Sequence, residues 1–163
     1  SNLANAFKYS THVNQLILAK QLIEHGANVN ALSNHKSETP LHKACYAGVV
    51  TNLDFIQLLL KEGADPNAQD HSGTTPLMYT IPNAPGVAEL LLDWPTTDVN
   101  LTTRTGVSFM TRVMKAVDTL SYAAALPDNP YRVQHQCLLG QWEMIEWTLV
   151  KMGAADDTGT TLE

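Results

Sequence analysis

The chain is poor in the residues and patterns that mark several large protein classes. Its 163 residues include two cysteines, Cys45 and Cys137, which lack CxxC spacing. They predict neither a zinc site nor a disulfide framework, and indicate two small buried side chains in a reducing compartment. No apolar run approaches the roughly 20 residues that span a membrane. No secretion signal opens the chain, so we expect an intracellular protein, cytoplasmic or nuclear, with no membrane contact.

Charge is also scarce, and it is mostly negative. Charged residues make up 16% of the chain, with 16 Asp and Glu against 10 Lys and Arg, which gives a formal net charge of −6. Because no run of Lys or Arg exists, nucleic-acid binding lacks its main electrostatic contribution. About five of the six net negative charges fall in the C-terminal half. Electrostatics there favours binding of a basic or neutral partner.

Patterns typical of catalysis and metal binding are missing from the sequence. It contains no HExxH, P-loop, dinucleotide fingerprint or nucleophile elbow. Its six histidines include no pair at i, i+4 and no Cys/His quartet with zinc spacing. We therefore predict a non-enzyme without metal or cofactor.

Internal repetition is the strongest signal in the chain. Gly-Ala-Asn-Val-Asn-Ala at 26–31 returns as Gly-Ala-Asp-Pro-Asn-Ala at 63–68, and in degraded form at 97–100 and 153–154. Thr-Pro-Leu-His at 39–42 returns as Thr-Pro-Leu-Met at 75–78, and Leu-Leu-Leu occurs at 58–60 and 90–92. The corresponding asparagines, Asn30, Asn67 and Asn100, are 37 and 33 residues apart. Such a period predicts a stack of similar helical units.

These motifs, their order and their period resemble the ankyrin repeat. The resemblance implies an all-α solenoid of about four helix-turn-helix units, with short hairpin-like fingers and an enlarged C-terminal helical cap. The expected units cover about 1–30, 31–67, 68–100 and 101–154, with a flexible tail at 155–163. We treat 1–163 as one domain cut from a longer protein, because its start carries no initiator Met.

Helix signals place the elements within these units. Thr39 and Thr75 can cap helices that begin with proline, and Gly63 can end one in the left-handed conformation. The predicted helices cover 3–12, 14–25, 39–47, 52–61, 75–81, 86–93, 108–124 and 131–152. The closing Gly-Ala pair of unit four lies at 153–154, whereas the repeat period places it near 130. Unit four has therefore gained about two dozen residues. Only His42 retains the family's histidine, which usually ties neighbouring repeats together by hydrogen bonds.

The resemblance also implies where a partner binds. Ankyrin solenoids present a concave face built from fingers and first helices. The positions of this chain that match the family's variable contact sites are His35, Lys36, Glu38, Tyr46, His71, Ser72, Thr74, Tyr79, Arg104, Thr105 and Arg112. Tyr46 and Tyr79 could equally be buried between layers. Because His35, Lys36 and Arg104 make the fingers mildly basic, an acidic peptide could dock there.

Two further features leave alternatives open. The apolar stripe of the last predicted helix either only covers the core or leaves Trp142, Trp147 and Met152 as a patch for a partner. Asn100, and less closely Asn30 and Asn67, match the asparagine that dioxygenases hydroxylate in many ankyrin proteins. The simpler reading is that these side chains fix the turn.

The predicted function is non-catalytic binding of a partner protein or peptide on the concave face, by a chain that is monomeric by itself. The first alternative is a targeting or regulatory arm of a larger enzyme whose catalytic domain lies outside 1–163. The second is a structural module that self-associates through the Trp-bearing helix. The sequence does not identify the partner, because proteins that share one fold perform many different functions.

Overall fold

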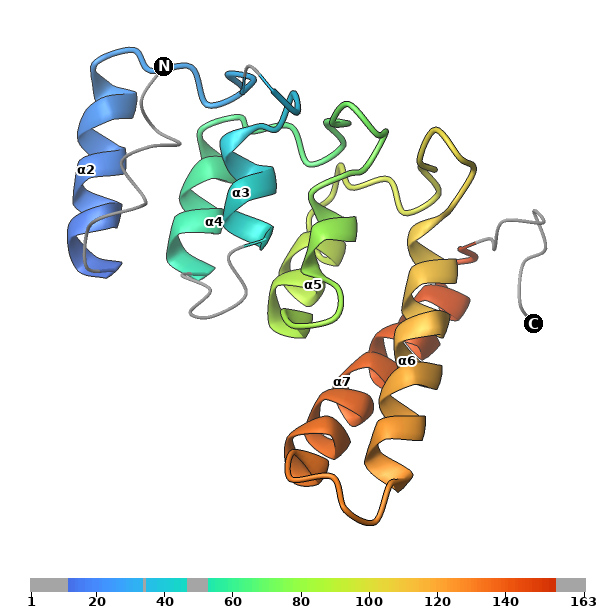
Figure 1. The fold of residues 1–163 in the computed structure, drawn as a ribbon. Helices are drawn as coiled ribbons and strands as arrows, with labels where there is room; N and C mark the ends of the chain where they lie inside the picture. Colours follow the sequence, from blue (N-terminus) through green and yellow to red (C-terminus); the bar gives the residue numbers. More distant parts are fainter. Residues whose placement is uncertain (1–11, 34, 47–52, 155–163) are drawn as a thin grey trace.

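The computed structural model describes residues 12–33, 35–46 and 53–154, which form an all-α stack of helical units (Figure 1). In chain order, the elements are α2 (His12–Glu24), α3 (Pro40–Tyr46), α4 (Leu53–Lys61), the 3₁₀ helix η1 (Leu77–Thr80), α5 (Pro85–Leu92), α6 (Phe109–Ala125) and α7 (Arg132–Lys151). Within this described part no strand is assigned, and the one isolated bridge joins Thr102 to Ser108. The helix expected over 3–12 lies outside the described residues, apart from His12.

The helices form two layers, as the repeat pattern predicts. The first helix of each unit contacts its neighbour in one layer, α3 against η1 and η1 against α6. The second helices lie behind them, with α2 against α4 and α5 against α7. Loops between units project together at one end of the stack, and we call their tips the fingers (Figure 1).

The helix starts follow from capping side chains. The Thr39 hydroxyl accepts a hydrogen bond from the backbone N–H of His42 at 3.3 Å, and Pro40 occupies the first helical position. The Ser108 hydroxyl accepts from Thr111 N–H at 3.1 Å and starts α6 in the same way. These bonds satisfy N–H groups that have no partner inside the helix.

Unit three differs from the helix predicted over 75–81, because only one 3₁₀ turn forms there. Ile81 precedes Pro82 and has extended dihedrals, φ −80° and ψ 137°. A residue before proline is pushed out of the helical region by contact with the proline ring. The helix therefore stops early, and Pro82 becomes the start of a turn that leads into α5.

The second helices end as the glycines predict. Gly63 has φ +87°, and the N–H of Ala64 donates to Leu59 O at 2.8 Å. Gly153 has φ +71°, and the N–H of Ala154 donates to Leu149 O at 3.0 Å. Unit four thus closes in the same way as unit two, after its long insertion.

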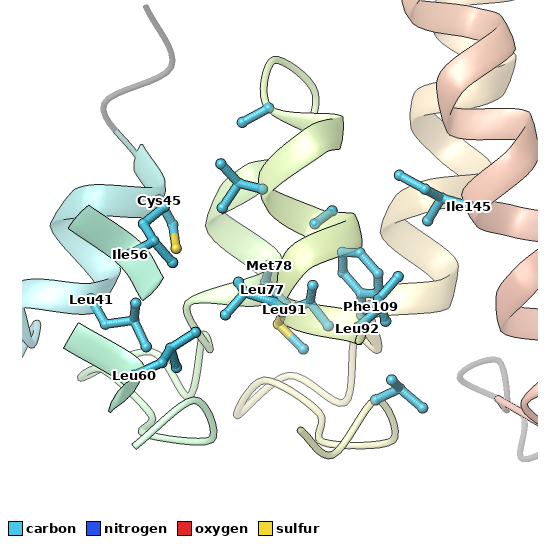
Figure 2. Packing of buried hydrophobic residues seen from close by; sticks show 14 of the residues in the cluster. Leu41, Cys45, Ile56, Leu60, Leu77, Met78, Leu91, Leu92, Phe109 and Ile145 are labelled. Atoms are coloured by element: carbon cyan, nitrogen blue, oxygen red, sulfur yellow. The ribbon is translucent and has the colours of Figure 1, made fainter. Parts of the chain in front are cut away.

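Between the layers lies one continuous apolar core, shown in Figure 2. It runs from Leu41 and Ile56 in unit two, through Leu77 and Leu91, to Phe109 in unit four, and all five are at most 2% exposed. Burying such a side chain contributes roughly 1.5–3 kcal/mol. Because each unit covers the next one, stability depends on contacts between neighbours rather than on any unit alone.

The fingers are short hairpins that hydrogen-bond to one another. Within its finger, Asp70 N–H donates to Thr74 O, and Thr103 N–H donates to Val107 O, both at 3.0 Å. Between fingers, His71 N–H donates to Lys36 O at 2.8 Å, and Arg104 N–H donates to Ser72 O at 3.0 Å. The main chain therefore fixes the spacing of the finger tips.

Asparagine side chains add further hydrogen bonds between neighbouring units. The Asn30 amide donates to Gly63 O and accepts from Asp65 N–H, both at 2.9 Å. Asn67 repeats this pattern, donating to Thr96 O at 2.7 Å and accepting from Asp98 N–H at 2.8 Å. The turn-fixing role expected for Asn30 and Asn67 is therefore confirmed.

The histidine expected to join units does so. His42 Nε2 lies 2.9 Å from Thr74 O in the next finger, while Nδ1 accepts from Thr39 N–H at 3.2 Å. Because Nδ1 is an acceptor there, the proton of the neutral ring resides on Nε2 and is donated to Thr74. Burial is the main cause that lowers the pKa of His42, which favours this neutral form.

Candidate interaction face

A cavity of about 300 Å³ opens on the first-helix layer, where three units meet. Tyr46 contributes to it from the end of α3, Tyr79 from η1, and Arg112 from the first turn of α6. Its other lining residues are Asp70, Ser72, Thr74, Met78 and Ile81. Positions that the sequence places in units two, three and four are thus brought together in one hollow.

Edge-to-face aromatic contacts form one wall of this cavity. The rings of Tyr46 and Tyr79 have centroids 5.8 Å apart with an interplanar angle of 81°. Tyr79 also meets the buried His42 ring edge-on, at 5.5 Å. Tyr46 nevertheless remains 74% exposed. A large aromatic side chain that is fixed at one edge and open to solvent is typical of an interface anchor.

The Tyr79 hydroxyl lies between two carboxylates from neighbouring fingers. It is 2.8 Å from Asp70 Oδ2 and 3.0 Å from Glu38 Oε1. One hydroxyl proton can be donated to only one of them at a time. Burial first, and then the bonds to both carboxylates, raises the pKa of Tyr79. The phenol therefore stays protonated and joins unit three to the finger of unit two.

Asp70 is held inside its finger. Its Oδ1 accepts hydrogen bonds from Ser72 N–H at 2.7 Å and Thr74 N–H at 2.8 Å. Burial would raise the pKa of Asp70, but these bonds and that from Tyr79 outweigh it and lower the pKa. The carboxylate thus remains charged, and its acceptor capacity is used within the protein.

Arg112 is the cation that lines the cavity. It is half-buried, and no hydrogen bond or ion pair joins its guanidinium to another residue of the described ranges. A guanidinium presents five donors in a planar fork, which suits a carboxylate. Its donors are thus available to a ligand in the cavity.

The other predicted contact residues differ in how far they are exposed. His35, Lys36, His71, Ser72, Arg104 and Thr105 are exposed on the finger tips, and Glu38 is half-buried beneath them. Thr74 is only 7% exposed, and its carbonyl accepts from His42. Thr74 nevertheless lines the cavity, so its role as a contact residue stays a prediction.

The apolar patch that the sequence left open as an alternative on the last helix needs correction at one residue. Trp142 is fully buried, and its Nε1–H donates to Pro82 O at 2.7 Å. It therefore anchors α7 to the turn of unit three and belongs to no surface patch. Trp147 is 58% exposed, with Lys151 Nζ 3.5 Å from its ring centroid, and Met152 is also exposed.

Several lining residues of the cavity were not predicted from the sequence. Asp70 was not among the predicted contact residues, and only the structure brings it beside Tyr79. Met78 and Ile81 occupy core-like positions of the repeat, and no pattern marked them as partly open to a cavity. A second cavity of about 510 Å³ lies on the second-helix side, between α4 and α5, and was not predicted.

Other chemistry has little support within the described ranges. No group of three or more His, Cys, Asp or Glu side chains there could hold a metal ion. The Cys45 thiol is buried as expected, and burial raises its pKa, which makes it a poor nucleophile. The expectation of burial was wrong for Cys137, which is exposed on α7. Among the described helices, none combines the length and apolar character needed to cross a bilayer.

Asn100 occupies the same repeat position as Asn30 and Asn67. Its side chain is exposed, and its backbone N–H donates to Asp98 Oδ1 at 2.9 Å. Hydroxylation at this asparagine stays a prediction.

Known proteins resemble parts of this chain. It is 41% identical over 63 residues to the 2-5A-dependent ribonuclease of Mus musculus. The aligned segment covers 39% of this chain and 8% of that protein. The chain is 37% identical over 91 residues to an ankyrin repeat-containing protein of Schizosaccharomyces pombe, covering 53% and 38% of the two chains. An ankyrin repeat protein of Acanthamoeba polyphaga mimivirus is 36% identical over 88 residues, covering 53% and 54%. The chain thus spans only a small part of the ribonuclease and about half or less of the others.

The family comparison covers the first three units of the stack. A model of three ankyrin repeats matches residues 6–103, which is more than half of the chain and ends before α6 begins. The repeat motifs, the two-layer stack and this match agree, and the chain belongs to the ankyrin-repeat family.

Proposed function

We propose that this chain binds a partner protein through its concave face, without catalysing a reaction. Ankyrin repeats generally mediate protein–protein interactions, and ankyrin domains are generally non-catalytic. By concave face we mean the fingers (35–38, 70–74 and 103–107) together with the first-helix segments 40–46, 76–82 and 109–115. The observation that carries the proposal is the cavity shared by Tyr46, Tyr79 and Arg112.

This cavity has the features of an anchor site for one side chain of a partner. Its lining combines aromatic and aliphatic side chains with polar ones, among them the Arg112 guanidinium, which has no partner in the described ranges. Interface energy concentrates at such central pockets, and Tyr and Arg are favoured in them. The finger tips around it are polar and exposed, which suits the rim of an interface.

Selection of peptides from a random phage-displayed library tests this proposal without knowledge of the natural partner. Peptides enriched on the wild-type chain would be measured by fluorescence polarisation against Tyr46→Ala and against Tyr122→Ala. Both tyrosines are more than 70% exposed, but Tyr122 lies on α6 outside the concave face. We expect Tyr46→Ala to weaken binding at least about tenfold, and Tyr122→Ala to leave it unchanged. Peptides that bind all three proteins equally would place the site elsewhere.

A second candidate function is self-association through α7. Met144 and Trp147 are exposed on this helix, and Met152 is exposed at its C-cap. Exposed apolar groups often mark contact surfaces. Light scattering at high protein concentration tests it. A monomer would agree with the expectation from sequence and remove this candidate.

A further inference from the structure

We propose that the concave face takes an extended acidic segment of its partner, an inference that rests on the proposed function. The chain as a whole is acidic, but its charges are segregated. Five Lys or Arg and two carboxylates lie on the concave face, a net charge of +3; the cations are Lys36, Lys43, Arg104, Arg112 and Lys115. Elsewhere in the described residues, four Lys or Arg oppose eleven Asp or Glu, a net charge of −7.

The two carboxylates of the face are engaged by the protein itself. Asp70 is 7% exposed and accepts two backbone N–H groups as well as the Tyr79 hydroxyl. Glu38 shares that hydroxyl, lies 3.8 Å from Lys36 Nζ, and has a side chain only 15% exposed. A docking partner therefore meets the cations of this face more directly than its carboxylates.

Repeat register places three of these positions in one row. Three residues share one repeat position, four after the Thr or Ser that precedes the first helix of units two, three and four. They are Lys43, Tyr79 and Arg112, which follow Thr39, Thr75 and Ser108. Packed helices lie roughly 8–10 Å apart, so Lys43 and Arg112 are separated by roughly 16–20 Å. An extended peptide rises about 3.3 Å per residue. Acidic residues about five or six positions apart would thus reach both cations.

The middle of that row is suited to an apolar side chain. Tyr79 lies between the two cations, and beside it Tyr46, Met78 and Ile81 line the cavity. The complementary segment therefore has an apolar residue midway between two acidic ones. A lysine-rich segment would instead meet five cations on this surface, and such like-charge contacts disfavour binding.

The probe for this inference is a capped, fluorescent peptide in a serine and glycine background. It carries two glutamates six positions apart and a leucine midway between them. The comparison peptide has lysine in place of both glutamates. Binding is measured by fluorescence polarisation at low and at high salt, because exposed charge pairs are screened by ions.

Two matched double variants separate the row from overall charge. Lys43→Gln with Arg112→Gln removes both cations of the row. Lys20→Gln with Lys61→Gln removes the same charge from α2 and α4, on exposed positions of the second-helix layer. Circular dichroism first confirms equal helicity of both variants.

We expect the glutamate peptide to bind wild type more tightly than the lysine peptide and to weaken at high salt. The Lys43→Gln, Arg112→Gln variant should bind the glutamate peptide about tenfold more weakly than wild type. The Lys20→Gln, Lys61→Gln variant should bind it less than about twofold more weakly. No measurable binding, equal losses in both variants, or preference for the lysine peptide would overturn the inference.

Failure here is distinguishable from failure of the proposed function. Library peptides that require Tyr46 but carry no acidic excess would support binding on the concave face and overturn the acidic segment. Library peptides that ignore Tyr46 would overturn the concave face itself.

Discussion

The stacking of fingers leads to a test in which two glycines serve as each other's control. Gly73 and Gly106 occupy the same finger position in units three and four, with φ of +76° and +82°. Their surroundings differ. A Cβ on Gly73 would lie 2.7 Å from Arg104 N and 3.1 Å from two backbone atoms of Thr103, whereas a Cβ on Gly106 would meet nothing within 4 Å.

The expected magnitudes follow from these distances. Alanine at either position has to adopt the left-handed conformation, which costs about 1–2 kcal/mol. At Gly73 the new methyl also meets main chain, which cannot rotate away as a side chain would. The neighbouring finger has to shift, and the Arg104 N–H to Ser72 O bond of 3.0 Å stretches or breaks. Losing it costs about 0.5–1.5 kcal/mol. Together with the cost of the left-handed conformation, we expect a loss of roughly 1.5–3.5 kcal/mol for Gly73→Ala.

Urea denaturation followed by circular dichroism gives the free energy of unfolding of both variants. Hydrogen exchange adds a local readout, since the Arg104 amide should exchange faster in Gly73→Ala and stay protected in Gly106→Ala. If the two variants lost equal stability, or if Gly106→Ala lost more, close contact between fingers would not be what requires glycine at position 73.

Three further substitutions test other parts of the argument. Ser37 has φ +55° at the corresponding point of the first described finger, so Ser37→Gly should stabilise by about 0.5–1 kcal/mol; thermal melts should show a gain that Ser37→Ala lacks. His42→Gln should flatten the pH dependence of stability. Burial lowers the pKa of His42 below 6.5, so below pH 6.5 the unfolded chain binds the proton first and wild type loses stability until the folded pKa is passed. Urea titrations at pH 7.5 and 5.5 check this, and a constant difference between the two proteins would contradict it. Trp142→Phe removes the donor to Pro82 O and should cost roughly 1–3 kcal/mol, against less than about 0.5 kcal/mol for the exposed Trp147→Phe; equal losses would mean that the buried bond contributes nothing.

The repeat pattern predicts most of the fold because its signals are local. Thr39, Pro40 and Gly63 specify helix ends through capping and backbone conformation, and each lies next to the end that it sets. The predicted limits of α3 to α7 accordingly agree with the structure to within one or two residues, apart from the 3₁₀ turn before Pro82.

Contacts over long sequence separations were not predictable in the same way. Trp142 and Pro82 are 60 residues apart, and periodicity alone marks Trp142 only as one member of an apolar stripe. Which face of that stripe is covered depends on the angle at which α7 packs on α5. The side-chain spacing of one helix does not contain that angle, so Trp142 and Trp147 looked alike in the sequence.

Comparison of equivalent repeat positions could have predicted which side of unit four faces away from unit three. Positions that are apolar or buried inside the stack carry different residues on that side. Where unit two has His42 and unit three Met78, both buried, unit four has the half-buried Thr111. Where the second helices carry the buried Ile56 and Ala88, α7 carries Glu146, which is half-buried.

The carboxylate of Glu146 would be unfavourable at an apolar interface between two units. Burial first, and then the charges of Asp118 and Glu143, raises its pKa. Deeper burial under a further unit of the same kind would remove more water from this carboxylate, and a buried charge without a partner is strongly unfavourable. Thr111 lacks the imidazole with which His42 reaches the next finger. The outer side of α6 and α7 is therefore built to meet solvent or a surface of different chemistry, which favours a capping role for this long helix pair.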